Sequence, residues 1–178
     1  MAVDWNAVGA ISTAGAAVIA LAIWVSDLIH RHRERRATER FLAQVTIPAV
    51  ATAQLEIAKL RTYLAEPCDG EMTRAHFLFR SGDARAEAAE RAARVVLDLP
   101  PAVVDRAAAF RPRASNRMAW AAAKVRRLND ASRLMMEIGP GISKEGLDTA
   151  ITVFCTEVLE TEKAIGEAFE ILLVAGKA

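Results

Sequence analysis

The feature that most constrains this chain is an uncharged segment of 22 residues near its N-terminus, from Trp5 through Ser26. A helix rises about 1.5 Å per residue, so the segment is long enough to cross a hydrocarbon core of about 30 Å. A soluble core helix of this length would show a polar face, and this segment shows none. The sequence therefore predicts a single transmembrane helix, with the lipid bilayer as the partner of residues 5–26.

Two tryptophans flank the predicted span. Trp5 and Trp24 lie 19 residues apart, about 28 Å along a helix, which suits one indole ring at each headgroup layer. A buried soluble helix and a cleaved secretory signal are the alternatives. The four residues before the span are acidic rather than basic, and the apolar run exceeds a typical signal core, so we expect the segment to be retained.

The charges around the span predict its orientation. No Lys or Arg precedes it, whereas five arginines follow within fifteen residues, namely Arg31, Arg33, Arg35, Arg36 and Arg40. Basic residues favour the cytoplasmic side, so we expect the N-terminus outside and the C-terminal region in the cytoplasm. Cys68 and Cys155 match no short redox or metal spacing, which agrees with a reducing compartment. Arginine outnumbers lysine 18 to 5, which together with the many alanines is typical of a GC-rich bacterial genome. We therefore expect the membrane to be a bacterial inner membrane.

Composition favours helices over strands. Alanine supplies 37 residues, whereas proline and glycine together supply 15. We therefore expect an all-α protein with an N-terminal transmembrane anchor over residues 1–29 and a small antiparallel cytoplasmic helical bundle over 30–178. The expected elements are a juxtamembrane helix over 30–64, a loop over 67–82 and helices over 83–98, 102–110, 115–138 and 143–174.

Three apolar rows with helical spacing predict the core of the bundle. The row over residues 50–64 can pack within the chain or form a coiled coil between chains, and its spacing fits both arrangements equally well. The rows are Val50, Ala53, Ile57, Leu60 and Leu64; Met118, Ala121, Val125, Leu128, Met135 and Ile138; and Leu147, Ile151, Phe154, Val158, Ile165 and Leu172.

Local signals predict where these helices begin, end or bend. Pro48 should kink or interrupt the juxtamembrane helix, because proline lacks the N–H that the ladder needs. Asp83 should cap the helix over 83–98, and Ser115 or Asn116 should cap the helix over 115–138. Ser143 should restart the chain as a helix.

Opposite charges gather on the last two predicted helices. Residues 106–133 hold eight basic residues against one aspartate, and residues 139–178 hold seven acidic residues against three lysines. One stripe of the first helix carries Arg113, Arg117, Trp120, Lys124 and Arg127. The stripe can pack on the acidic C-terminal helix or bind anionic lipid headgroups. We expect no nucleic-acid partner, because the chain lacks a recognition motif and an aromatic stacking platform.

Two further groups contain reactive residue types. His30 and His32 point about 200° apart on a helix and cannot share one metal ion. Cys68 and His76 are near one another in sequence, but no glycine-rich nest or nucleophile elbow accompanies them. The sequence therefore predicts no catalytic, cofactor-binding or metal-binding residue, and we expect a protein that is not an enzyme.

The functional expectation is a membrane-anchored helical module for interaction or scaffolding, with an unknown protein partner. The alternatives are a sensor or remodeller of anionic membrane surfaces and an enzyme centred on Cys68 and His76. Small residues repeat every fourth position of the span, which permits a homo-oligomer formed through the membrane helix. These residues are Gly9, Thr13 and Ala17 in one row and Ser12, Ala16 and Ala20 in the next.

Overall fold

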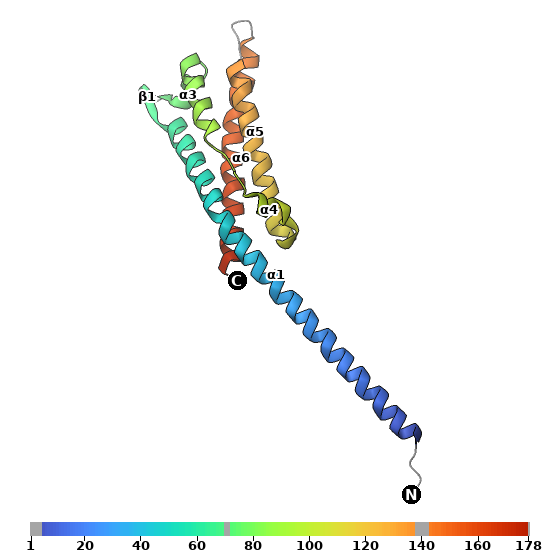
Figure 1. Cartoon of the computed structure of the whole chain (residues 1–178). Coiled ribbons are helices and arrows are strands. Elements are labelled where there is room, and N and C mark those ends of the chain that lie inside the picture. The colour runs from blue at the N-terminus through green and yellow to red at the C-terminus, as the bar shows by residue number, and fades with distance from the viewer. Residues whose placement is uncertain (1–4, 70–71, 138–142, 178) are drawn as a thin grey trace. The chain divides into compact units, whose positions relative to one another are not determined.

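The computed structural model describes the backbone of residues 5–69, 72–137 and 143–177, and their side chains from Ala16 onward except those of Ala17 and Asp69. The described chain is mostly helical (Figure 1). It divides into two compact units, Met1–Thr38 and Glu39–Ala178. The first helix, α1 (Trp5–Ala65), contributes residues to both.

The first unit consists of the N-terminal part of α1. Its described side chains from Val18 through Ala37 are all exposed, including Ile23 at 65% and Trp24 at 61%. By length and composition, α1 is the one helix in the described parts of the chain that is apolar enough to cross a membrane. The structure therefore has an N-terminal candidate span where the sequence predicts one.

The second part of α1 packs into the other unit through a continuous row. Val50, Ala53, Ile57, Leu60 and Leu64 are all buried, as predicted. They belong to one hydrophobic core with buried residues of the later helices. This row is therefore covered within the chain, which answers the ambiguity that its spacing left open.

Pro48 does not interrupt α1, so of the two predicted effects, a kink or an interruption, the interruption is absent. The helix runs without a gap from Trp5 to Ala65. A proline inside a helix removes one backbone hydrogen bond and costs about 3 kcal/mol. Leu42 and Ala43 before it and Val50 and Ala53 after it are fully or almost fully buried. Core packing on both sides of the proline outweighs the local cost.

The segment predicted as a loop over 67–82 contains short regular elements, so the described fold is not purely helical. Strands β1 (Pro67–Asp69) and β2 (Met72–Thr73) pair antiparallel, and a single turn, α2 (Arg74–Phe77), follows. Leu78 is fully buried and anchors this segment to the core.

Tyr63 at the end of α1 holds the strand pair in place. The guanidinium groups of Arg74 and Arg91 lie 4.7 and 4.1 Å from the centre of its ring. Arg74 also pairs with Glu66, with Nε 3.1 Å from Oε2. Cation–π contacts of this kind favour a fixed position for a short segment that could not be stable alone.

Helix α3 (Gly82–Ala93) begins before the predicted cap and ends before the predicted end. Ser81, not Asp83, is the N-cap residue, and its hydroxyl accepts a hydrogen bond from the backbone N–H of Ala84 at 3.2 Å. The chain leaves the helix after Ala93, several residues before Pro100. Val95 is fully buried outside the helix, so the core holds this segment in a non-helical path.

The next elements also differ from their predicted bounds. The helix predicted over 102–110 is a helical turn, α4 (Pro101–Asp105), followed by a 3-10 turn, η1 (Ala107–Ala109). Helix α5 (Pro112–Glu137) begins at Pro112, so neither Ser115 nor Asn116 is its cap. Proline is favoured in the first turn because its missing N–H has no partner there in any helix.

Helix α6 (Lys144–Lys177) completes the bundle. Ser143 precedes it, as predicted, and its hydroxyl accepts from the N–H of Gly146 at 3.2 Å. Figure 1 shows α5 and α6 antiparallel, with α3 and the second part of α1 alongside them in the same unit. The rows of α5 and α6 are buried as predicted, except that Leu147 is half-buried and Ile138 lies outside the described residues.

Candidate functional site

The stripe predicted on α5 faces acidic side chains of α6. Lys124 Nζ lies 3.2 Å from Glu157 Oε2 and also bonds Glu160. Further along, Arg117 pairs with Glu167, and Arg127 Nε lies 3.5 Å from the second Glu157 oxygen. Three of the four cations in the stripe are therefore paired within the hairpin.

Lys124 is the most deeply buried of these cations, with 2% of its surface exposed. Its hydrogen bond to Glu160 raises the pKa of the ammonium group, against the opposing effect of burial. The same bond lowers the pKa of the Glu160 carboxyl group. Thr161 adds a hydroxyl hydrogen bond to the Lys124 carbonyl at 3.2 Å. A buried lysine must be paired to remain charged, so this cluster favours one register of α5 against α6.

The other members of the stripe are exposed. Trp120 is 49% exposed, and the Lys124 ammonium lies 5.2 Å from its ring centre. Arg113 is exposed at a separate cavity of about 330 Å³, which Arg111 and Glu39 also line. The contacts therefore place three cations of the stripe beside the acidic helix, while Arg113 and Trp120 are exposed.

Glu39 is a structural residue that the sequence pattern did not indicate. It is 7% exposed, and its carboxylate accepts hydrogen bonds from the Arg111 backbone N–H at 3.1 Å and pairs with the Arg111 guanidinium at 3.3 Å. It thereby ties α1 to the start of α5. In the sequence Glu39 is one acidic residue among the arginines of 31–40, and only the tertiary structure shows its partner.

The arginines predicted to set topology lie on the exposed part of α1. Arg31 pairs with Asp27 at 2.6 Å, and Arg33, Arg35, Arg36 and Arg40 are exposed. His30 Nε2 lies 3.5 Å from Glu34. No group of three metal-binding side chains comes together among the residues that the structure describes.

Cys68 and His76 do not form a catalytic pair in the structure. Both are exposed, and the His76 Nδ1 atom lies 3.0 Å from the Thr73 hydroxyl, at the start of α2. Within the described residues no hydrogen bond links the thiol to the imidazole. Cys155 is half-buried, and burial raises the pKa of its thiol, which disfavours the reactive thiolate.

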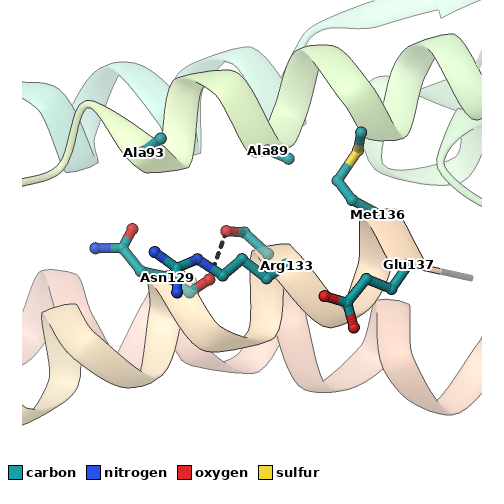
Figure 2. Close-up of a pocket in the computed structure, with 7 residues that line it drawn as sticks. Ala89, Ala93, Asn129, Arg133, Met136 and Glu137 are labelled. Carbon is teal, nitrogen blue, oxygen red and sulfur yellow. Dashed lines mark hydrogen bonds between the residues drawn. The ribbon is translucent and has the colours of Figure 1, made fainter.

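A pocket of about 330 Å³ lies between α3 and α5. Figure 2 shows Asn129, Arg133 and Met136 projecting from α5 into the space that faces Ala89 and Ala93 of α3. The alanine wall is smooth because methyl groups are the only side chains that α3 presents there. The long side chains of α5 therefore line most of the pocket.

The polar residues of this pocket all come from α5. The Ser132 hydroxyl donates to the Asn129 backbone carbonyl at 2.8 Å (Figure 2). The side-chain oxygen of Asn129 is buried and has no hydrogen-bond partner within the described chain. A water molecule or a ligand N–H can satisfy such an acceptor. The pocket thus combines an alanine wall with the Asn129 oxygen, which is unpaired among the described residues.

Comparison of the chain with protein families, with curated proteins and with solved structures found no match.

Proposed function

We propose that this protein is a single-pass membrane protein that presents a helical interaction module on the cytoplasmic side. Residues 5–26 are the anchor, the N-terminus lies outside, and the bundle over 39–178 is the module that a partner protein contacts. Each part of this proposal is supported by a different feature of the chain.

The exposed apolar surface of α1 in the first unit carries the proposal. Val18, Ile19, Leu21, Ile23 and Trp24 are each at least 60% exposed. Water does not favour such a continuous apolar surface, which is far larger than the scattered exposed residues of a soluble protein. A bilayer covers side chains on every face of a helix, and this segment is apolar on every face.

The arginines after this segment support the orientation. All five of them follow the span and none precedes it. All five are exposed, although Arg31 also pairs with Asp27, and the anionic inner leaflet attracts basic residues by about 1 kcal/mol each. Among its described residues the second unit has clefts lined partly by apolar side chains, which supports a role in binding a partner.

Two arginines placed in the span test the anchor. In the full chain, Ala16→Arg with Ile19→Arg should remove the protein from carbonate-washed membranes, because each central arginine opposes insertion by about 2.5–3.5 kcal/mol. The matched control is Ala37→Arg, which adds a cation to a segment that is already basic, and it should leave the protein in the membrane fraction.

A reporter of membrane topology completes the test. Fused to the N-terminus it should be accessible from outside, and fused to the C-terminus it should not. Recovery of the unaltered chain in the soluble fraction without detergent would contradict the anchor, and a cleaved N-terminus would identify the segment as a signal.

A further inference from the structure

The α5–α6 hairpin has one face whose paired positions follow a simple register. Arg117 pairs with Glu167, Lys124 with Glu160, and Arg127 with Glu157. From one pair to the next, the position on α5 rises by seven and then by three residues, and the position on α6 falls by the same numbers. This is the relation that antiparallel helices require. Continuing this register past Arg127 places Ala131 beside Val153 and Leu134 beside Ala150.

The chemistry of this face changes at that point. The first three levels are bridged by ion pairs between the two helices, beside a pocket of about 360 Å³ that Arg117, Lys124 and Glu160 also line. At the next two levels the facing residues are apolar, and Leu134 and Val153 remain 60% and 45% exposed. One face therefore contains a half whose facing residues are joined by ion pairs and a half whose facing residues are apolar.

The apolar half borders a groove of about 690 Å³. Its lining includes the small residues Ala131, Gly146 and Ala150 together with Leu134 and Val153. Small residues on two antiparallel helices allow the backbone of a third helix to come close. The groove is thus shaped for a helix of a few turns rather than for a small polar molecule.

The charges at the groove have one sign. Glu137 and Glu145 line it, both are exposed, and no Lys or Arg is among its described lining residues. Neither carboxylate forms an ion pair within the described chain, in contrast to Glu157, Glu160 and Glu167 on the same face. The connecting residues 138–142 contain no charged residue that could neutralise them.

We propose that this groove binds an amphipathic helix of a partner protein, with apolar residues against Leu134 and Val153 and with Lys or Arg beside Glu137 and Glu145. The proposal rests on the proposed function, because it assigns to the interaction module the surface that a partner contacts. Helix-in-groove binding uses apolar anchors at helical spacing, and the surrounding charges provide specificity and orientation.

Site-specific photocrosslinking tests the groove in the full chain in neutral detergent. Cys68→Ser and Cys155→Ala remove the native thiols, and Leu134→Cys then carries a benzophenone. Leu159→Cys is the matched control, because Leu159 is also 60% exposed on this hairpin but does not line the groove. The probe is an 18-residue helical peptide of leucine and lysine, and the second probe replaces every lysine by glutamate.

The expected result is saturable crosslinking of the leucine–lysine peptide from position 134, little from position 159, and little of the glutamate peptide at either. Glu137→Lys with Glu145→Lys should weaken half-saturation about tenfold, as the reversal of two exposed charges implies. These two residues are exposed, so circular dichroism and the melting temperature should remain unchanged in the double variant.

Three results would overturn the proposal. They are equal crosslinking from both positions, crosslinking that charge reversal does not weaken, and crosslinks between copies of this chain at position 134 without peptide, which would make the groove a homotypic interface. None of these results affects retention in washed membranes, so failure of the groove and failure of the anchor are separable.

Discussion

The two parts of α1 use apolar side chains in opposite ways. Before Thr38 the described side chains of the helix are exposed on every face, whereas after Glu39 one row is buried and the other faces are largely polar or partly exposed. The same secondary structure is therefore packed within the chain along one part and exposed along the other. A row of buried residues indicates packing on one side, whereas an apolar surface on all sides is typical of a membrane-spanning segment.

The largest expected change in the free energy of unfolding comes from the packed part of α1. Ile57 is fully buried, so Ile57→Ala should lower the free energy of unfolding of the bundle by about 2–5 kcal/mol, through lost burial and a cavity. Ile23→Ala in the exposed part should change it by less than about 0.5 kcal/mol. Urea unfolding of the full chain in detergent, followed by circular dichroism, measures both. Similar losses in the two variants would mean that the parts of α1 do not differ in packing.

A second comparison concerns ion pairs. Lys124→Ala leaves Glu157, which is 8% exposed, without its buried cation, and we expect a loss of about 1–3 kcal/mol. Arg31→Ala removes an exposed pair with Asp27, which should cost between about 0 and 1 kcal/mol. The same urea titration compares them, and high salt should reduce only the smaller effect. Equal costs would contradict the structural role of the Lys124 cluster.

Pro48 tests how α1 tolerates a helix-breaking residue within its packed part. Pro48→Ala should raise the free energy of unfolding by a net amount of about 2 kcal/mol. Removing the helix-breaking proline gains about 3 kcal/mol, and the greater freedom of the unfolded chain offsets about 1 kcal/mol of that gain. Thermal unfolding measures the gain. The control is Ala49→Gly at the adjacent position, which should instead cost about 1 kcal/mol. A destabilised Pro48→Ala chain would show that the packed helix requires the proline.

The smallest expected effect is the dependence of stability on pH. Glu87 and Glu160 have pKa values below the ordinary 4.5, because Tyr63 hydrogen bonds the first and Lys124 the second. The unfolded chain therefore binds more protons in the acidic range, so this stability is present above about pH 5 and is lost as pH falls through the folded pKa values. The melting temperature should fall on acidification, and Glu160→Gln should make that fall shallower. Lys124 has a raised pKa, so its contribution to stability is fully present below the ordinary lysine pKa of 10.5 and is lost only as the pH rises above that value.

Much of the helical core was predictable because its residues repeat at a helical period. The rows through Val50, Val125 and Phe154 needed no knowledge of neighbouring helices, since periodicity is a property of the chain alone. Helix ends were less predictable. Ser81 and Asp83 are both good caps, and local residue type alone did not show that the helix begins at Gly82 with Ser81 as its cap.

The candidate site was likewise predictable only in part. The stripe from Arg113 to Arg127 is visible in the sequence, and its complementary partner on the C-terminal helix is visible as a count of charges. Which cation meets which carboxylate is not, because it depends on the register between α5 and α6. For the same reason the buried carboxylate of Glu39 and the open groove beside Leu134 appear only in three dimensions.

The sequence by itself determined the helical character of the chain, its apolar N-terminal segment and the rows that form its core, because these follow from composition and from periodicity along one helix. The tertiary structure decided what covers each row, that Pro48 lies within a continuous helix, and that ion pairs bridge one half of the α5–α6 face while apolar residues face each other in the other half. These outcomes depend on contacts between residues far apart in the chain, whose energies no local pattern contains.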